Sequence, residues 1–293
     1  MALLRSHRIS PHVVRLLEER DSAAAVLEEL AEVSCGPSAG ADCREPRLFK
    51  DDAPNIHILL DDAARDIAGW EAEGIGMLSL LDPGYPTNLR MVHDRPPLLF
   101  VAGELQTGDA RSVAVIGSRQ ASTHAVATAS RIAEHLVDCG YTVVSGLAAG
   151  IDSTAHRSTL VRRARTVAVI GTGLNRCYPP ENQSLQRQIA REGAVVSRFW
   201  PEDPPTRRSF PMRNAVMSGI ALATVVVAAG PTSGARIQAR LALAHGRPVF
   251  LLEPVLAQRW ARELATRPAT YVFRSPGEIT GALERLTFGA LVA

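Results

Sequence analysis

The sequence predicts an α/β fold over residues 111–293, a Rossmann-like core built on a mostly parallel sheet. Short runs rich in Val, Ile and Ala alternate there with longer stretches of helical composition. Strands that are apolar on both faces are typical of a parallel sheet with helices on either side. The first two apolar runs also end in turns of small residues, as strands of such sheets do where they pass into the next helix.

The same alternation predicts each element of the core. Strands are expected at 113–116, 142–145, 166–170, 194–197, 223–228, 248–252 and 271–273. Helices are expected at 123–137, 153–163, 182–192, 213–220 and 233–245. A closing helix is expected over 275–286, because Ser275 is a good N-cap and Pro276 suits the first helical turn.

The first 110 residues have a different organisation. Apolar residues at near-helical spacing predict one or two helices over 11–33, followed by a Gly-, Pro- and Asp-rich stretch and a further helix at 61–73. We therefore divide the chain into three parts. These are a small helical N-terminal domain (1–75), a connecting segment with a short strand near 95–103 (76–110) and the Rossmann-like core (111–293).

Composition indicates an ordinary globular protein. The 293 residues are 46% hydrophobic, which is enough to bury a large core. No apolar run approaches the roughly 20 residues of a membrane span, and the N-terminus lacks the apolar core of a signal peptide, so we expect a cytoplasmic protein. The four cysteines have no C-x-x-C spacing, so we expect neither a metal site nor a disulfide framework.

The formal net charge of +2 conceals an uneven distribution. Residues 1–110 contain 10 Lys and Arg against 19 Asp and Glu, whereas residues 111–293 contain 22 against 11. A basic core is expected of a protein that binds a polyanion such as a nucleic acid. The other interpretation is that the charge is only unevenly distributed between two solvated surfaces. The sequence leaves both interpretations open.

The turn Gly117-Ser118-Arg119 follows the first core strand, at the sheet edge where open α/β sheets bind ligands. Glycine permits close approach of a ligand to the backbone, serine offers a hydroxyl, and the guanidinium of arginine suits a phosphate. The motif departs from the G-x-G-x-x-G of NAD-binding proteins, and we expect no cofactor. Taken alone, it is equally consistent with a tight turn that carries a surface arginine.

The second turn runs from Ser145-Gly146 to Gly150, and it leaves backbone N–H groups free at a helix start, as a phosphate site requires. Asp152 and His156 follow one helical turn apart. A metal site or an acid–base pair would need further ligands or a nucleophile, and none is near in the sequence. We therefore expect structural roles, with Asp152 as the helix cap and the His156 ring in a local hydrogen bond.

Two later segments add candidate contacts. The loop over 171–182 contains Tyr178, whose ring can stack on a base or pack against the protein. The helix that opens at Phe210 can present Arg213 and Asn214 to phosphates or base edges. The other polar and basic candidates are Asn182, Arg198, Arg207 and Arg208. Because all these segments follow strands, they predict one groove at one sheet edge, which takes a nucleotide or a nucleic-acid backbone.

The ordered series of motifs resembles the DNA-processing protein A family, DprA, also called Smf. The resemblance covers about residues 85–252, and its specificity lies in the series rather than in any one member. The series comprises Tyr85-Pro-x-x-Leu89, Pro96-Pro-Leu-Leu-Phe100 with Gly103, Gly117-Ser-Arg119, Ser145-Gly-x-Ala-x-Gly-Ile-Asp152 with Ala155-His156, Gly173-Leu174 with Tyr178-Pro-x-x-Asn182, Phe210-Pro-x-Arg-Asn214 with Ser218-Gly219, and Ser233-Gly234 with Gly246-Arg247.

The resemblance implies an extended Rossmann fold behind a small helical domain, and a protein that is not an enzyme. Such a protein binds single-stranded DNA, dimerises through its core and helps to load the RecA recombinase in natural transformation or recombination. Arg119 would be the main phosphate contact, with Asp152 and His156 as structural support. The DNA-binding residues implied are Gly117, Ser118, Arg119, Ser145, Gly146, Gly150, Tyr178, Asn182, Arg198, Phe210, Arg213 and Asn214.

Some positions depart from the family pattern. Ala228 stands where a glutamate is usual, Arg236 lies in an altered Ser-Gly-x-x-x-Thr-Ala stretch, and Pro180 takes the place of a lysine found in some members. The chain ends at Ala293, so we expect no winged-helix module of the kind that many members append.

The alternative is a nucleotide-binding sensor on a related Rossmann scaffold. Related nucleotide hydrolases carry a glutamate in a Pro-Gly-Gly-x-Gly-Thr-x-x-Glu motif, and the stretch 228–234 has no such residue, which disfavours hydrolysis. A sensor would bind a mononucleotide saturably and in competition with DNA. A protein-interaction module, the third possibility, would fold and dimerise without DNA affinity.

Overall fold

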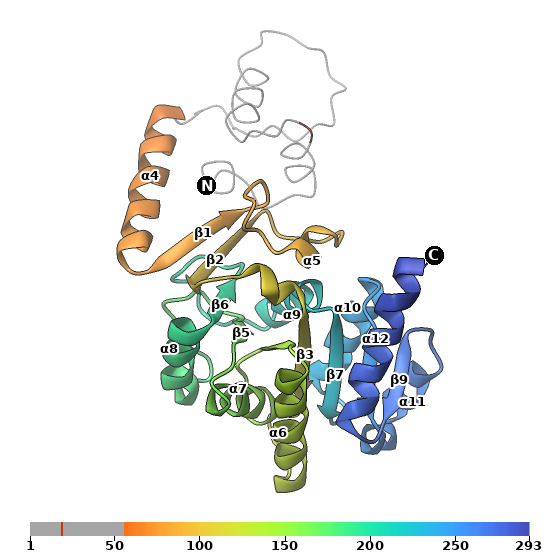
Figure 1. Cartoon of the computed structure of the whole chain (residues 1–293). Helices are drawn as coiled ribbons and strands as arrows, with labels where there is room; N and C mark the ends of the chain where they lie inside the picture. The colour runs from red at the N-terminus through yellow and green to blue at the C-terminus, as the bar shows by residue number, and fades with distance from the viewer. Residues whose placement is uncertain (1–18, 20–55, 293) are drawn as a thin grey trace, which may run out of the picture.

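The structure, a computed structural model, describes residue 19 and residues 56–292 (Figure 1). In this part of the chain the strands form one nine-stranded sheet in the order β1-β2-β6-β5-β4-β3-β7-β8-β9. All neighbouring pairs from β6 to β9 are parallel, whereas β1 and β2 join the β6 edge as antiparallel strands. The predicted α/β fold with a mostly parallel sheet is confirmed.

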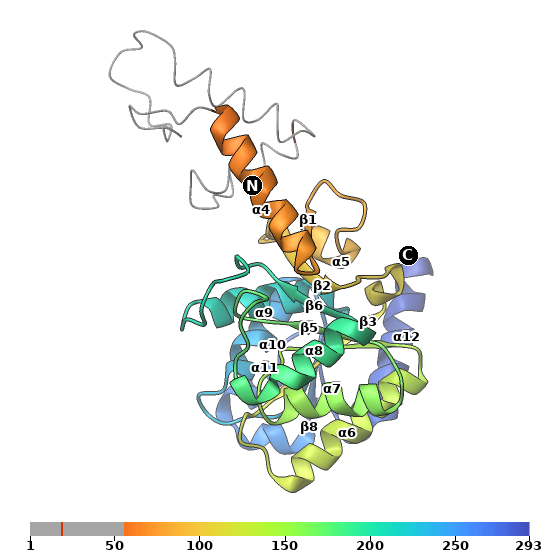
Figure 2. The same cartoon turned by 90° about the vertical axis from the view of Figure 1, so that its left-hand side faces the viewer.

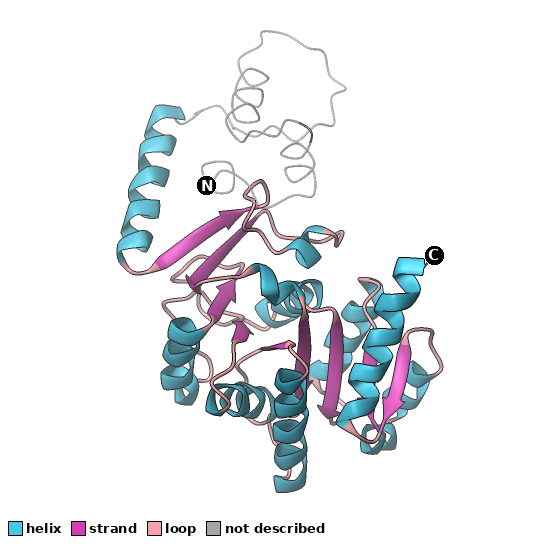
Figure 3. Cartoon of the chain, in the orientation of Figure 1, coloured by secondary structure: helices cyan, strands magenta, loops and turns pink. Residues whose placement is uncertain are grey.

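The elements follow one another along the chain as strand and helix in turn, which Figure 3 shows by colour. The strands are β1 (Ile75–Ser79), β2 (Leu98–Gly103), β3 (Ser112–Gly117), β4 (Thr142–Ser145), β5 (Thr166–Val169), β6 (Ala194–Ser197), β7 (Ala223–Ala228), β8 (Val249–Leu252) and β9 (Thr270–Phe273). The helices are α4 (Ile56–Ala72), α5 (Thr87–Arg90), α6 (Thr123–Asp138), α7 (Ile151–Val161), α8 (Gln183–Glu192), α9 (Ser209–Ile220), α10 (Gly234–Ala244), α11 (Arg259–Ala265) and α12 (Pro276–Val292), and short 3-10 turns span Thr107–Ala110, Pro180–Asn182 and Glu253–Ala257.

The predicted core strands are all found, and their ends differ from the prediction by at most one residue. Helix α9 begins at Ser209, which is four residues before the predicted range 213–220 and one residue before Phe210, where its motif predicts that the helix opens. Its first turn accommodates Pro211, because the first N–H groups of a helix have no acceptor within it. Helix α11 has 7 residues and was not predicted, because two turns are too short to show a helical period.

Two layers of helices cover the central strands. Helices α6, α7, α8 and α12 pack against one face of the sheet, and α9 and α10 pack against the other (Figures 1 and 2). The strand residues between these layers are fully buried, as Val115, Val144 and Val225 show. This accounts for the uniform apolar character of these strands, since a strand covered on both faces has no polar side. No helix of residues 56–292 is both long and apolar enough to cross a membrane.

The segment before the core is part of the same sheet. Strands β1 and β2 extend it, and Trp70 of α4 packs edge-on against Phe100 of β2, with ring centroids 5.2 Å apart. The side-chain amide of Asn88, on α5, donates to the carbonyl oxygens of Ala110 and Ile220. The division of the chain at residues 75 and 110 stays a prediction. The helix predicted at 61–73 is α4, whereas the helices predicted over 11–33 lie outside the described residues.

The strand order reverses between β3 and β7. From β3 the chain moves outward through β4, β5 and β6, and it then returns to pair β7 with the other side of β3. At such a point the loops after the two central strands run in opposite directions, which leaves a crevice at their carboxyl ends.

Candidate functional site

A cavity of about 460 Å³ opens at the carboxyl ends of β3 and β7. Its walls come from the loop after β3, from the start of α9, and from the loop and first turns that lead from β7 into α10. The lining residues that the sequence also predicted as a binding site are Gly117, Ser118, Arg119, Phe210, Arg213 and Asn214. The sheet therefore brings together two motifs that lie about ninety residues apart.

The loop after β3 lies directly on the turn that opens α7. A Cβ atom at Gly117 would lie 2.9 Å from the carbonyl oxygen of Ala228, so no larger residue fits between β3 and β7. Gly150 has φ of +77°, and a Cβ there would collide with the carbonyl oxygen of Ser118. The two glycines allow this close packing, and they hold the backbone of residues 117–119 at the cavity.

Arg119 extends from this loop over two aromatic rings. Its guanidinium carbon lies 5.2 Å from the ring centroid of Phe210 and 5.7 Å from that of Tyr178, within the range of a cation–π contact. The two rings are neighbours, with centroids 5.5 Å apart. Arg119 is exposed, and the Tyr178 ring is 40% exposed. An exposed cation thus lies beside a partly exposed aromatic residue near the cavity.

Arg213 lines the cavity, although its side chain is almost fully buried. The residue is 6% exposed, and its Nη1 donates to the carbonyl oxygen of Val169 at 3.1 Å. This nitrogen lies beside the Cα atom of Gly146, where a Cβ atom would overlap it. The Nε atom is buried and has no hydrogen-bond partner among the described residues. A buried N–H without a partner favours a ligand that brings an acceptor.

Asp152 is the second residue of α7, and Gly150 is the N-cap, so the prediction that Asp152 caps this helix is wrong. Its Oδ2 lies 2.7 Å from the position that a Cβ atom of Gly146 would take. Complete burial raises the pKa of its carboxyl group, while the positive charge of Arg213 and backbone hydrogen bonds from Gly117, Ala148 and Gly146 oppose this rise. Burial lowers the pKa of Arg213, and the nearby charge of Asp152 raises it. Each group thus favours the charged form of the other, and the backbone N–H donors favour the carboxylate form of Asp152.

One wall of the cavity is formed by residues that the sequence analysis did not include in the site. The loop Gly230–Ala235 and Gln238 of α10 line the cavity opposite the β3 loop. Ser233 caps α10 by accepting from the N–H of Ala235 at 3.2 Å, so the positive end of the helix dipole faces the site. The strand–Gly–Ser-Gly–helix pattern at 228–234 is a local signal for this turn, but only the pairing of β7 with β3 brings it to the cavity.

Three predicted residues make contacts elsewhere. The Ser145 hydroxyl is buried and donates to the carbonyl oxygen of Val115 at 2.6 Å. The Asn182 amide is buried and donates to the carbonyl oxygen of Leu147 at 2.9 Å. Both bonds stabilise the loops that support the site. Arg198 is half-buried after β6, where its charge interacts with Asp94 and Tyr85.

His156 is a residue of α7, and it is fully buried and lies away from the cavity. Its Nδ1 lies 2.8 Å from the hydroxyl of Thr166, and that hydroxyl donates to the carbonyl oxygen of Val143 at 2.7 Å. Nδ1 is therefore the protonated nitrogen that donates to Thr166. Burial lowers the pKa of His156 to about 3, so the ring is neutral at physiological pH.

The arrangement is suited to an anion with an attached ring. Arg119, Arg213 and the start of α10 supply positive charge, and Asp152 offsets only part of it. Phosphate oxygens accept from guanidinium groups and helix N-termini, and exposed aromatic rings stack on bases.

Two comparisons by sequence find similar proteins. A model of the family described as DNA recombination-mediator protein A matches residues 76–275. The DNA processing protein DprA of Streptococcus pneumoniae is 32% identical over 252 residues, which are 85% of this chain and 84% of that protein. The protein Smf of Synechocystis sp. is 42% identical over 175 residues. That match covers 58% of this chain and 44% of Smf, so the chain spans less than half the length of this relative.

A comparison of structures agrees with them. The X-ray structure of DprA from Streptococcus pneumoniae matches with a TM-score of 0.76 at 29% identity, over 96% of this chain and 95% of that one. DprA from Helicobacter pylori, whose structure is described as revealing a single-stranded DNA binding mode, matches with a TM-score of 0.63 over 72% of this chain and 96% of that one. Its identity is 24%, so this second similarity shows the fold alone.

Proposed function

We propose, since this chain belongs to the DNA recombination-mediator protein A family, that it binds single-stranded DNA at the carboxyl ends of β3 and β7. The observation that carries the proposal is the position of Arg119, which lines the cavity and lies over the neighbouring rings of Tyr178 and Phe210. A phosphate at the cavity and a base on the rings would use both features at once.

The preference for a single strand follows from the aromatic rings. In a duplex the bases are stacked and paired, and their faces are closed to a protein side chain. In a single strand a base can turn out and stack on Tyr178, which is 40% exposed. The phosphate contact by Arg119 carries no base information, so binding is expected to tolerate many sequences and to weaken with salt.

The same geometry favours a binding role over catalysis. Asp152 and His156, the pair with the spacing for acid–base chemistry, are both buried. The carboxyl group of Asp152 accepts from backbone N–H groups, and the ring of His156 bonds to Thr166. Asp152 thus stabilises the turn into α7, and His156 joins α7 to β5.

We extend the proposal to the partners of such a protein. By its resemblance to the family, the chain would act as a homodimer in the cytoplasm, protect incoming or processed DNA and help to load RecA onto it. Light scattering after gel filtration tests the dimer, and RecA filament assembly on DNA coated with a single-strand-binding protein tests the loading.

The experiment that tests DNA binding is the fluorescence anisotropy of a labelled oligo-dT titrated with the protein at two salt concentrations. An unlabelled duplex of equal length and deoxythymidine monophosphate serve as competitors. We expect salt-sensitive binding that the duplex displaces weakly. An absence of binding to the oligonucleotide contradicts the proposal.

The mononucleotide competitor addresses the second candidate function. The cavity of about 460 Å³ is large enough for a nucleotide. If the monophosphate displaces the oligonucleotide at micromolar concentration, the chain acts as a nucleotide sensor. If millimolar monophosphate is needed, the cavity is one subsite of a longer DNA-binding groove.

A further inference from the structure

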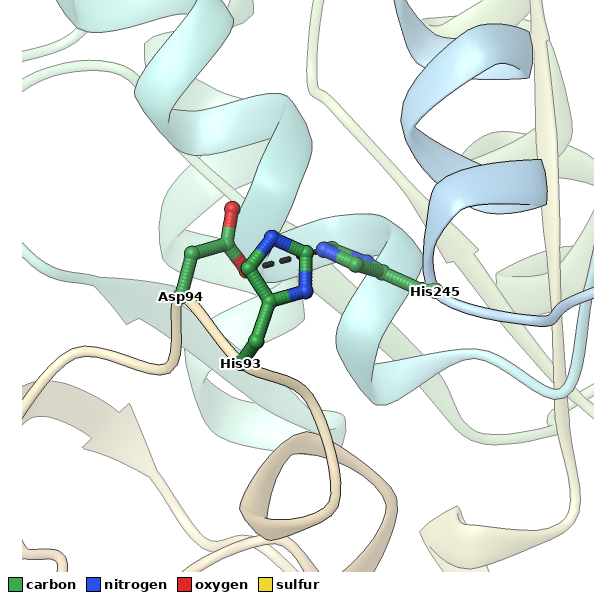
Figure 4. Close-up of side chains that lie close together, drawn as sticks. All are labelled: His93, Asp94 and His245. Atoms are coloured by element: carbon green, nitrogen blue, oxygen red, sulfur yellow. Dashed lines mark hydrogen bonds and ion pairs between the residues drawn. The ribbon is translucent and has the colours of Figure 1, made fainter.

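Three side chains capable of metal ligation meet at the junction between α5 and α10, away from the cavity. His93 and Asp94 follow α5, and His245 follows α10 (Figure 4). One ligand atom from each residue lies within 4.8 Å of the other two. The two histidines lie about 150 positions apart in the sequence, which is why residue spacing did not predict a metal site.

The shortest contact joins Asp94 and His245. Oδ1 of Asp94 lies 2.8 Å from Nε2 of His245. The His245 side chain has no exposed surface, whereas that of Asp94 is 36% exposed and His93 is exposed. The ring planes of the two histidines meet at 71°, with centroids 5.4 Å apart. The cluster thus has one fixed ligand and two ligands that can adjust.

The other nitrogen of His245 is held by a hydroxyl group. Nδ1 lies 2.9 Å from Oγ of Ser218, and that hydroxyl donates to the carbonyl oxygen of Ala215 at 3.1 Å. When the single hydrogen of this hydroxyl is used there, Nδ1 of His245 is the donor to Ser218. A histidine that donates from one nitrogen to a polar group presents the other nitrogen as a metal ligand.

This arrangement leaves the lone pair of Nε2 facing a carboxylate oxygen. Nε2 of His245 and Oδ1 of Asp94 are both acceptors in this arrangement, and they lie 2.8 Å apart. Either a proton or a metal ion must therefore lie between them. In a tetrahedral zinc site, bonds of about 2.0–2.2 Å place neighbouring ligand atoms about 3.3 Å apart. A small rotation of the Asp94 side chain reaches that spacing, and His93 lies close enough to complete the set.

We propose that His93, Asp94 and His245 bind one divalent transition-metal ion of the zinc class. Two imidazoles and a carboxylate form a donor set that zinc prefers, with a water in the fourth position. Arg198 is a cation whose charge interacts with Asp94, and it limits the affinity. The ion would link the segment after α5 to the end of α10, the helix whose first turn lines the cavity.

The test is isothermal titration calorimetry with Zn²⁺ on the full chain, purified without a polyhistidine tag and stripped with EDTA. The wild type, His93→Ala, Asp94→Asn and His124→Ala are compared. His124 is an exposed histidine on α6 and serves as the matched control. The variant is made at exposed His93 rather than at buried His245, so that the fold is preserved, and circular dichroism checks this.

We expect one Zn²⁺ per chain for the wild type and for His124→Ala, and an affinity at least tenfold weaker for His93→Ala and Asp94→Asn. Co²⁺ should give the visible absorption of a four-coordinate site in the wild type and lose it in His93→Ala. The proposal is overturned if the wild type binds no Zn²⁺ saturably, or if His93→Ala binds as tightly as the wild type. The second result would assign any bound ion to other cysteines or histidines.

Discussion

The guanidinium of Arg213 occupies the space that a side chain at Gly146 would fill. A Cβ atom at Gly146 would overlap Nη1 of Arg213 and would lie 2.7 Å from Oδ2 of Asp152. Arg213 of α9 and Asp152 at the start of α7 thus both pack against a glycine that follows β4. The positive charge of Arg213 at the cavity depends on the absence of a Cβ atom at residue 146.

Substitution of Gly146 by alanine should therefore affect both stability and binding. The methyl group would displace Arg213 from Val169, and overpacking of this kind costs about 1–3 kcal/mol. We expect Gly146→Ala to lower the free energy of unfolding in urea by that amount and to weaken single-stranded DNA binding. Gly108→Ala is the control, because a Cβ atom at Gly108 meets nothing within 4 Å. Equal stability of the two variants would contradict this account of Gly146.

Replacement of Arg119 tests the phosphate contact. We expect Arg119→Ala to weaken oligo-dT binding for all base sequences alike, and to reduce the slope of log K against log salt by about one unit. Anisotropy titrations at several salt concentrations measure both quantities. Arg191→Ala is the matched control. Arg191 is an exposed arginine at the end of α8, next to the amino end of β6, whereas the cavity lies at the carboxyl ends of the strands. An unchanged slope for Arg119→Ala would remove this residue from the interface.

Replacement of Tyr178 tests the stacking surface. Loss of one base–aromatic stack costs about 1–3 kcal/mol, so Tyr178→Ala should weaken binding by roughly fivefold to 150-fold. Tyr178→Phe retains the ring and should bind like the wild type. With an oligonucleotide of abasic sites, the alanine variant and the wild type should bind alike, because no base is present to stack. A loss of affinity that persists with the abasic ligand would show that Tyr178 acts through the protein and not through a base.

His156 predicts a specific dependence of stability on pH. Burial lowers the pKa of His156 to about 3, whereas an unfolded chain has a histidine pKa of about 6.5. Between these values the unfolded state binds the proton and the folded state does not, so stability decreases as the pH falls from 6.5 toward 3. From pH 7.5 to pH 5.0 this residue should contribute a loss of about 2 kcal/mol.

Urea unfolding of the wild type and His156→Asn at the two pH values measures that contribution. Asparagine retains a donor for Thr166 and has no titrating group, so the variant should lose less stability on acidification than the wild type. Carboxylates contribute equally to both proteins and cancel in the comparison. Identical pH dependence in the two proteins would show that His156 is not the titrating group.

The sequence alone determined the local features of this protein. Val- and Ile-rich runs predicted the core strands, because a strand that is buried on both faces has apolar side chains on both faces. The small residues around Gly117 and Gly150 predicted turns with close backbone approach, which the positive φ of Gly150 bears out. The ordered motifs between Tyr85 and Leu252 also pointed to the family that the comparisons show.

Only the tertiary structure decided which of these segments meet. Strand order depends on hydrogen bonds between distant segments, and no local period encodes it. The pairing of β7 with β3 brings the start of α10 to the cavity. The side chains of Ser145 and Asn182 bond to backbone carbonyl groups and stabilise the loops of the site. The approach of His245 to His93 and Asp94 has the same origin, because it arises where α10 ends against the segment after α5.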